Sequence, residues 1–559
     1  MRWLVVCVGA LASAVGATIV TDDAALASDK TFDFVIAGAG LSGLTVANKL
    51  SRQGHSVLVI EAGPDGSWNP AVFSAQDRPY PPVFCNWAYP RHDDAGNKLD
   101  STIDAGACIG GSTSINGMVW IRPTKAEVDQ LEALGNPGWN WESLEPHMAA
   151  IERNMPPTKA QIAQGAGLDP DVHGHDGQVN TSFPTPMRIP KAVQLYKDSL
   201  PLVFSGLQVG NDLSNRTSVV SASTSWTMWY DPATGKHVRS SAADALLWAP
   251  GEQRSALTVL ANHTVAKVTF DEDLKATGVV FVSTLTKNQG PVYAVKARRS
   301  VILAAGTLAT PPILERSGLG DSRILAAAKI EQLVDLPGVG ANLNDKPGVE
   351  TRALMPKKLH NDTSLVGGPS VFGPEISLVN INEIWATKPV AEIVAETYPT
   401  VFSAISWPSL PLSRGHVHVK SASPFEFPVI VPRFLADQFD QQVAVAVARM
   451  SRAVWTTKPF QGYVEDAYYN PKIGPNGTDT DYLEWLKRTG GGASHWVGTT
   501  AMMPRHLGGV VDSRLRVYGT RNLRVVDAGV LPIQSTAHIM SILYGVAQRA
   551  AGLILEDCP

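Results

Sequence analysis

Residues 32–43 read FDFVIAGAGLSG, in which an apolar run leads directly into closely spaced glycines. Gly38 permits a tight turn, Gly40 lets the backbone approach a pyrophosphate, and Gly43 allows a helix to pack closely against a strand. A glycine pattern of this kind is weak when it stands alone. The residues on its C-terminal side therefore decide whether the turn binds a ligand.

A helix and a second strand follow the turn in the order that a dinucleotide-binding unit requires. The helix is predicted from Leu41 to about Gln53, with its N-terminal amides directed at the phosphates. A second apolar run, 56–60, ends at Glu61, where a carboxylate can accept hydrogen bonds from ribose hydroxyls. Together these features predict a βαβ unit that binds a dinucleotide, and the unit alone does not choose between FAD and NAD.

The composition is that of a globular protein. The chain has 559 residues, of which 44% are hydrophobic and 18% are charged. This length exceeds what a single hydrophobic core usually serves, so we expect two consecutive or intertwined domains. The 47 basic and 51 acidic residues give a net charge of −4 without a basic stripe, so nucleic acid is not an expected partner.

The N-terminus has the pattern of a secretory signal peptide. Arg2 precedes an apolar run from Trp3 to about Val20 that contains small residues suited to cleavage, and residues 1–17 are the predicted signal. An uncleaved membrane anchor is the alternative, which the glycines in the run disfavour. The mature protein is predicted to be extracellular, N-glycosylated and free of the membrane. Acceptor triplets for N-glycosylation start at Asn180, Asn215, Asn262, Asn361 and Asn476.

Cysteines are too few to carry the fold through disulfides. Removal of the signal peptide leaves Cys85, Cys108 and Cys558, an odd number. One Cys85–Cys108 bridge is possible in an oxidising compartment, and the sequence does not settle the pairing. The chain has no CxxC, HExxH or other metal-ligand spacing, so no bound metal is predicted.

Strand patterns like those of the first unit recur late in the chain, which indicates a discontinuous domain. Residues 300–306 form a second strand-turn-helix pattern, and residues 522–527 form a third. An amphipathic helix is predicted from about Ala537 to Leu555. The predicted nucleotide-binding domain consists of 30–145, 241–330 and 501–559, and the other domain consists of 146–240 and 331–500.

Two further segments carry specific motifs. Residues 110–123 read GGSTSINGMVWIRP, and residues 306–320 read GTLATPPILERSGLG. Together with 495–499 and 527–538, they resemble the glucose-methanol-choline (GMC) oxidoreductases, in particular the fungal glucose oxidase-like and cellobiose dehydrogenase flavodomain-like branch. The resemblance covers most of the chain. It implies an α/β (α+β overall) protein in which a Rossmann-type FAD-binding domain is interwoven with a substrate domain built on an antiparallel sheet with helices.

The resemblance implies FAD as the cofactor, with its flavin ring reaching between the two domains. Ala107 stands where relatives usually carry Arg, Lys or Asn, and the resemblance therefore predicts that one polar contact to the cofactor is absent. Ile115 stands where relatives with covalently attached flavin carry histidine, which predicts non-covalent FAD. By position, the resemblance assigns cofactor contacts to Gly38, Gly40, Leu41, Ser42, Glu61, Ser112, Asn116, Gly117, Val265, Asp527 and Ile539.

Two histidines match the catalytic pair of the family. His495 follows a glycine-rich run, and His538 lies in the last segment of the resemblance. Oxidation of an alcohol requires a proton to leave oxygen while a hydride leaves carbon for flavin N5, and imidazole suits a base near neutral pH. We therefore predict that His495 is the base and that His538 orients the same hydroxyl.

The sequence defines the substrate less sharply. Glucose oxidases carry arginine and asparagine where this chain has Gly491 and Ala493, which argues against glucose. The segment 339–412 is also shorter than in glucose oxidases, which predicts a reshaped pocket. Aryl, secondary-metabolite and sugar alcohols all stay open as substrates. The sequence does not choose between O2 and a quinone as the electron acceptor, or between a monomer and a homodimer. The tryptophans considered as lining residues are Trp120 and Trp496 first, then Trp87 and Trp407.

A rival interpretation comes from another functional class. GMC-like hydroxynitrile lyases and a mycotoxin cyclase retain FAD without net redox chemistry, and Ala107 keeps such a lyase or cyclase open as an alternative. A non-catalytic binding protein is a third interpretation, in which His495→Ala would change nothing measurable. The favoured prediction is an FAD-dependent oxidase or dehydrogenase that acts on the CH–OH group of an alcohol.

Overall fold

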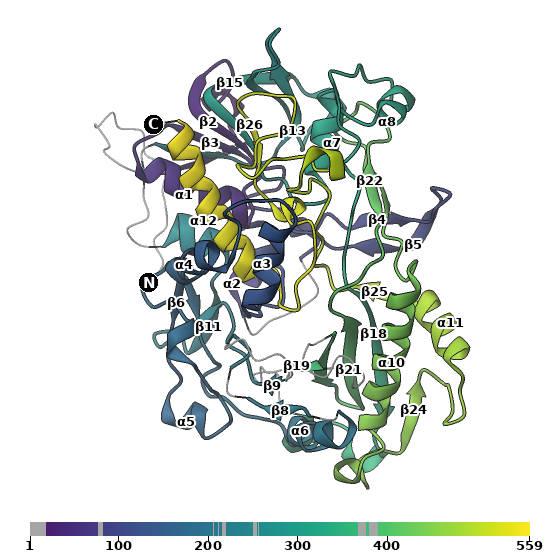
Figure 1. Ribbon diagram of the computed structural model, residues 1–559. Helices are drawn as coiled ribbons and strands as arrows, with labels where there is room; N and C mark the ends of the chain where they lie inside the picture. The colour runs from purple at the N-terminus through teal and green to yellow at the C-terminus, as the bar shows by residue number, and fades with distance from the viewer. Residues whose placement is uncertain are drawn as a thin grey trace.

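Two large β-sheets organise the molecule (Figure 1). The computed structural model describes residues 18–75, 82–204, 206–210, 212–214, 220–249, 254, 256–366, 376–379 and 390–558. The predicted signal peptide, 1–17, and the acceptor residue Asn215 lie outside the described residues. In Figure 1 the first sheet occupies the upper part of the molecule, and the second lies below it beside the helix α10.

The first sheet contains the predicted βαβ unit. Its strand order is β1-β12-β3-β2-β15-β14-β13, and β26 pairs with β15. The strands from β1 to β15 and β26 are parallel, whereas β13, β14 and β15 form an antiparallel meander. The strands are β1 (Ile19–Thr21), β2 (Thr31–Ala37), β3 (Val57–Ile60), β12 (Leu257–Leu260), β13 (His263–Phe270), β14 (Ala276–Ser283), β15 (Val292–Leu303) and β26 (Leu523–Val525).

Helices cover this sheet and fix its glycine turn. The helix α1 (Leu41–Arg52) begins directly after Gly40, and a Cβ on Gly43 would lie 2.0 Å from the Gly38 carbonyl oxygen. Only glycine therefore allows the helix to approach the turn this closely. The helix α12 (Met540–Asp557) packs against α1 and against α4 (Trp141–Ile151). Because α12 begins three residues later than predicted, His538 lies in the loop before it.

The second sheet is antiparallel except for the pairing of β8 with β9. Its order is β24-β18-β21-β20-β19-β9-β8, with β25 paired to β18. The helix α10 (Gln438–Val454) packs on β18 and β21 and buries an apolar face there. The strands are β8 (Gln208–Val209), β9 (Val220–Ala222), β18 (Pro347–Leu354), β19 (Ile376–Val379), β20 (Ala391–Thr397), β21 (Val401–Pro408), β24 (Asp466–Asn470) and β25 (Gly491–Gly492).

Further helices and small two-stranded sheets complete the fold. Each large sheet draws its strands from separate stretches of the chain. The strand β1 precedes residue 30, where the predicted nucleotide-binding domain begins. Within the described part of the chain, no helix is both long and apolar enough to cross a membrane. The remaining helices are α2 (Pro70–Phe73), α3 (Lys125–Ala133), α5 (Lys159–Ile162), α6 (Lys191–Val203), α7 (Thr310–Arg316), α8 (Ser322–Ala327), α9 (Thr363–Val366) and α11 (Asp479–Thr489). The small sheets pair β4 (Tyr89–His92) with β5 (Lys98–Ile103), β6 (Glu152–Asn154) with β7 (Val179–Thr181), β10 (Met228–Asp231) with β11 (Lys236–Arg239), β16 (Leu319–Gly320) with β17 (Val334–Asp335), and β22 (His416–His418) with β23 (Val429–Val431).

A buried ionic network lies beside β6. His173 contacts Glu152 through Nδ1 at 2.6 Å and Asp212 through Nε2 at 2.8 Å, and Arg122 contacts Glu152 at 3.0 Å. Burial acts to lower the pKa of His173, but the hydrogen bonds and negative charges of Asp212 and Glu152 outweigh it and raise that pKa to about 9. His173 is therefore a buried imidazolium at neutral pH.

This network predicts a pH-dependent stability. The folded-state pKa of His173 exceeds its ordinary 6.5, so its stabilisation is complete below that pH and is lost as pH rises through about 9. We expect the free energy of unfolding to fall by up to about 3 kcal/mol over this window. Thermal melts from pH 6 to 10 should show a steeper fall in Tm for the wild type than for His173→Gln. Parallel curves for the two proteins would contradict the assignment.

Candidate active site

A cavity of about 780 Å³ extends from the glycine turn after β2 to the two predicted catalytic histidines. Both predicted halves of the site, the dinucleotide cradle and the histidine pair, therefore open into one space. The predicted residues that line it are Gly38, Gly40, Leu41, Ser42, Glu61, Ser112, Asn116, Gly117, Val265, His495, Trp496, Asp527, His538 and Ile539.

Two glycine-rich loops face each other at the N-terminus of α1. A Cβ on Gly111 would lie 2.8 Å from the Gly40 Cα, so a side chain at Gly111 would collide with the backbone of the first loop. The Ser42 hydroxyl is buried and has no hydrogen-bond partner in the structure. Unpaired amides at a helix N-terminus, a free hydroxyl and bare backbone together fit the pyrophosphate of FAD.

Glu61 organises the turn at the end of β3. Its Oε2 accepts a hydrogen bond of 2.7 Å from the Ala39 amide, and its Oε1 accepts one of 2.9 Å from the Gly63 amide. Burial raises the pKa of Glu61 to about 7, although these hydrogen bonds oppose the shift. The carboxylate thus joins the two turns that flank the cradle, and it lines the cavity where a ribose is expected.

Two other predicted cofactor residues are held by neighbouring segments. Asn116 accepts a hydrogen bond of 2.9 Å at Oδ1 from the Arg239 guanidinium. Asp527 accepts hydrogen bonds at Oδ2 from the Thr310 hydroxyl at 2.6 Å and from the Gly306 amide at 3.0 Å. The Asp527 carboxylate therefore fixes the turn after β15 as well as lining the cavity.

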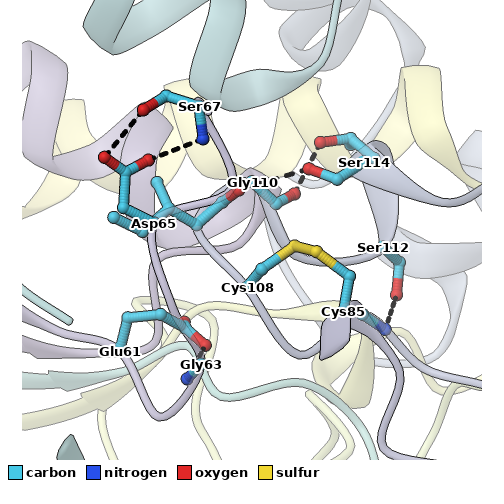
Figure 2. Close-up of a disulfide and its surroundings, with 12 residues drawn as sticks. Glu61, Gly63, Asp65, Ser67, Cys85, Cys108, Gly110, Ser112 and Ser114 are labelled. Carbon is cyan, nitrogen blue, oxygen red and sulfur yellow. Dashed lines mark hydrogen bonds between the residues drawn. A yellow bond between two sulfur atoms is a disulfide. The ribbon is translucent and has the colours of Figure 1, made fainter. Parts of the chain in front are cut away.

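A disulfide ties the second glycine loop to the segment before β4 (Figure 2). Cys85 and Cys108 are bonded, their Cα atoms lie 5.0 Å apart, and both side chains are fully buried. This is the bridge that the sequence left open. Cys108 lies two residues before Gly110, and a Cβ on Gly63, whose amide donates to Glu61, would lie 2.6 Å from the Cys108 amide nitrogen. The disulfide therefore braces one wall of the cofactor cradle.

Loss of this disulfide should weaken both the fold and the cradle. The bridge closes a segment with a sequence separation of 23 residues, which corresponds to roughly 3 kcal/mol of stabilisation. In the variant Cys85→Ser/Cys108→Ser we expect a lower Tm and release of FAD at a lower denaturant concentration, read from flavin fluorescence. Cys558→Ser, which removes a free cysteine, is the matched control and should behave like the wild type. Equal behaviour of all three proteins would refute a bracing role.

The histidine pair lies at the other end of the cavity. The ring centroids of His495 and His538 are 4.6 Å apart, and the rings are inclined by 71°. Asp345 holds the loop of His495, because its carboxylate accepts hydrogen bonds from the Ser494 amide at 3.0 Å and the His495 amide at 2.8 Å. Ser494 has a φ of 60°, a left-handed conformation that costs energy for a residue with a side chain.

The two histidines have different surroundings. Among the described residues, His495 Nδ1 is buried without a hydrogen-bond partner, and burial, reinforced electrostatically by the neighbouring His538 and Lys346, holds the pKa of His495 well below 6.5. His538 Nε2 instead lies 2.8 Å from Glu392 Oε1. His495 is therefore a neutral imidazole that can take up a proton, and Glu392 fixes the orientation of His538.

Glu392 belongs to a buried charged cluster behind His538. Its Oε2 accepts a hydrogen bond of 3.1 Å from Trp407 Nε1 and lies 3.8 Å from Lys346 Nζ. Burial acts to raise the pKa of Glu392, but His538 and Lys346 outweigh it and the pKa is lowered. Glu392 is thus an ionised carboxylate that no solvent reaches.

Two of the four tryptophans considered as lining residues need correction. Trp496 and Trp87 line the cavity, as considered. Trp120 does not: it is only 1% exposed and packs in the main hydrophobic core, with its ring 6.1 Å from that of Tyr544. Its large apolar surface is covered by the hydrophobic core, which includes Tyr544 of α12, so the ring is not accessible to a substrate. Trp407 also lies outside the lining; it donates a hydrogen bond to Glu392, and its ring lies edge-on to that of His538 with centroids 6.4 Å apart.

Sequence reasoning missed Arg239, Lys346 and Glu392. None of them lies in a motif, because each acts through a residue that is distant along the chain. One signal was available: residues 390–395 read VAEIVA, and an acid flanked on both sides by apolar strand residues requires a partner when it is buried.

Comparison with known proteins agrees with the site. Profiles described as GMC oxidoreductase match residues 32–348 and 411–547. The chain is 35% identical to the glucose oxidase-like protein fsoC of Humicola fuscoatra, over 94% of this chain and 95% of that protein. It is 32% identical to glucose oxidase 2 of Penicillium expansum, over 97% and 95% of the two chains. An FAD-dependent oxidoreductase from Chaetomium thermophilum superposes with a TM-score of 0.81 at 26% identity, covering 94% of this chain and 99% of that one.

The parallel sheet with its glycine cradle and the paired histidines define a flavoprotein oxidoreductase that acts on CH–OH groups. The chain belongs to the GMC oxidoreductase family. The predicted family resemblance and the α/β fold class with an FAD-binding domain are confirmed.

Proposed function

We propose that this protein oxidises an alcohol whose hydroxyl is carried by an apolar group. The observation that carries the proposal is the histidine pair, with ring centroids 4.6 Å apart, in the same cavity as the FAD cradle. Bound FAD supplies the acceptor for the hydride that leaves the alcohol carbon, and O2 or a quinone then removes the electrons. Ile115 lines the cavity at the position of the covalent histidine of other relatives, so FAD is bound non-covalently.

The two histidines have different roles toward the substrate hydroxyl. His495 is neutral and takes the hydroxyl proton on an imidazole nitrogen as the hydride leaves. His538 donates from Nε2 to the ionised Glu392, which leaves its Nδ1 as the atom available to the substrate. A hydroxyl placed between the rings is therefore oriented by one imidazole and deprotonated by the other.

The walls near the histidines support an apolar substrate. Ala493 and Val119 line the cavity and pack in one apolar cluster with Ala537, the residue before His538, whereas Gly491 does not reach the cavity. The polar groups that grip sugar hydroxyls in glucose oxidases are thus absent from this wall. Aryl alcohols and apolar secondary-metabolite alcohols fit such a surface better than sugars, because a sugar would leave buried hydroxyls unpaired.

Anaerobic absorbance spectroscopy of the purified protein tests this function. We expect one class of apolar alcohol to bleach the oxidised-flavin band, while glucose leaves it unchanged. Admission of air would then separate an oxidase from a dehydrogenase. A bound flavin that stays oxidised during turnover of a substrate would overturn the proposal in favour of a lyase or cyclase.

We further propose that the protein is secreted and N-glycosylated. Asn361 and Asn476 are exposed, as acceptor sites must be. Intact mass of the protein from a fungal culture medium, before and after deglycosylation, should reveal cleavage near residue 17 and attached glycans. Protein that stays inside the cells with its N-terminal segment still attached would contradict secretion.

A further inference from the structure

Lys346 is a fully buried lysine beside the histidine pair. It directly precedes β18, and its Nζ donates a hydrogen bond of 3.0 Å to the carbonyl oxygen of Ala537, the residue before His538. The same Nζ lies 3.8 Å from Glu392 Oε2. The ammonium group therefore holds both the backbone next to His538 and the carboxylate that binds its ring.

Lys346 also contacts the loop of His495. Its carbonyl oxygen accepts a hydrogen bond of 3.0 Å from the Ala493 amide, and its neighbour Asp345 accepts one of 2.8 Å from the His495 amide. Residues 345–346 thus connect the two histidine segments, which lie far apart in the sequence.

Burial and the neighbouring carboxylates have opposite effects on the pKa of Lys346. Burial lowers its pKa, whereas the carboxylates of Glu392, Glu127 and Asp345 oppose that shift. Glu127 is also engaged by the Thr536 amide at 2.6 Å. Two imidazoles belong to the same cluster: the charge of Lys346 acts on His495, and His538 contacts Glu392, which lies 3.8 Å from Lys346 Nζ. A positive charge in this place favours an ionised Glu392 and disfavours a proton on His495.

We infer that Lys346 is a positioning residue whose ammonium charge keeps Glu392 ionised and His495 unprotonated. The inference rests on the proposed function, in which His495 is the base. Without this charge, His495 binds a proton more readily, and the base is lost at a higher pH. Lys346 therefore extends catalysis toward acidic pH.

Three substitutions separate charge from hydrogen bonding. Lys346→Arg keeps the charge and a donor, Lys346→Gln keeps only a donor, and Lys346→Met keeps neither. We expect the acidic limb of kcat/KM to move up by about one pH unit in the glutamine and methionine variants and to stay in place in the arginine variant. The matched control is Lys49→Met, because Lys49 Nζ also donates to a carbonyl, that of Gln548 at 3.2 Å, and neither residue lines the cavity.

A second readout is independent of turnover. Titration of His495 by NMR with 13C-labelled histidine, assigned through His495→Gln, should show a higher pKa in Lys346→Gln than in the wild type. If no alcohol is oxidised, the proposed function fails while this titration still tests Lys346. A shift confined to Lys346→Met would mean a purely structural hydrogen bond, and unchanged titrations in every variant would mean no charge effect; either result overturns the inference.

Discussion

Replacement of His495 by alanine is expected to slow flavin reduction by the alcohol substrate by about 10²- to 10⁴-fold, with FAD still bound. The imidazole is the only group assigned to take the hydroxyl proton, and water at the cavity wall is a poor substitute for a positioned base. The backbone of the loop is held by Asp345 through the Ser494 and His495 amides, so removal of the ring leaves the loop in place.

Stopped-flow absorbance under anaerobic conditions measures this step directly. His506→Ala is the matched control, because His506 is exposed and outside the cavity lining, and it should reduce at the wild-type rate. The FAD content of both variants should equal that of the wild type. A His495→Ala enzyme that is reduced at more than a tenth of the wild-type rate would exclude His495 as the base.

The sequence was sufficient where one local pattern fixes one local structure. The run 32–43 together with Glu61 specified the βαβ unit, because its glycines stand where a side chain would not fit. A Cβ on Gly43, for example, would lie only 2.0 Å from the Gly38 carbonyl oxygen. The motif positions placed His495 and His538 in one cavity. The prediction that Trp120 lines the pocket was wrong, because an aromatic residue near a motif can pack in the hydrophobic core as readily as it lines a pocket.

The rest of the site depends on contacts between distant segments. Lys346 and Glu392 meet only because β18 and β20 flank β21 in the second sheet, a pairing that no short window of sequence encodes. The Cys85–Cys108 bridge was one open possibility until the fold brought the two segments together. Sequence reasoning therefore found the residues that motifs mark and missed those that hold them in place.

Replacement of Glu392 by glutamine should destabilise the protein by about 3 kcal/mol, because it removes the carboxylate with which the buried Lys346 ammonium forms an ion pair and leaves only the weaker effects of Glu127 and Asp345. Both side chains are fully buried, with Nζ and Oε2 3.8 Å apart, so water cannot compensate for the loss. Glutamine is close in size to glutamate, but its one carboxamide oxygen can accept from Trp407 or from His538 and not from both, so the expected loss also includes one hydrogen bond.

The double variant Glu392→Gln/Lys346→Met provides the decisive comparison. Since it removes both charges, it should recover most of the stability that Glu392→Gln loses, and denaturant unfolding of the wild type, both single variants and the double variant gives the coupling energy. A favourable coupling of at least about 1 kcal/mol is expected for a desolvated pair. Additive losses would show that the two charges do not interact, and Lys346 would then owe its place to the Ala537 carbonyl alone.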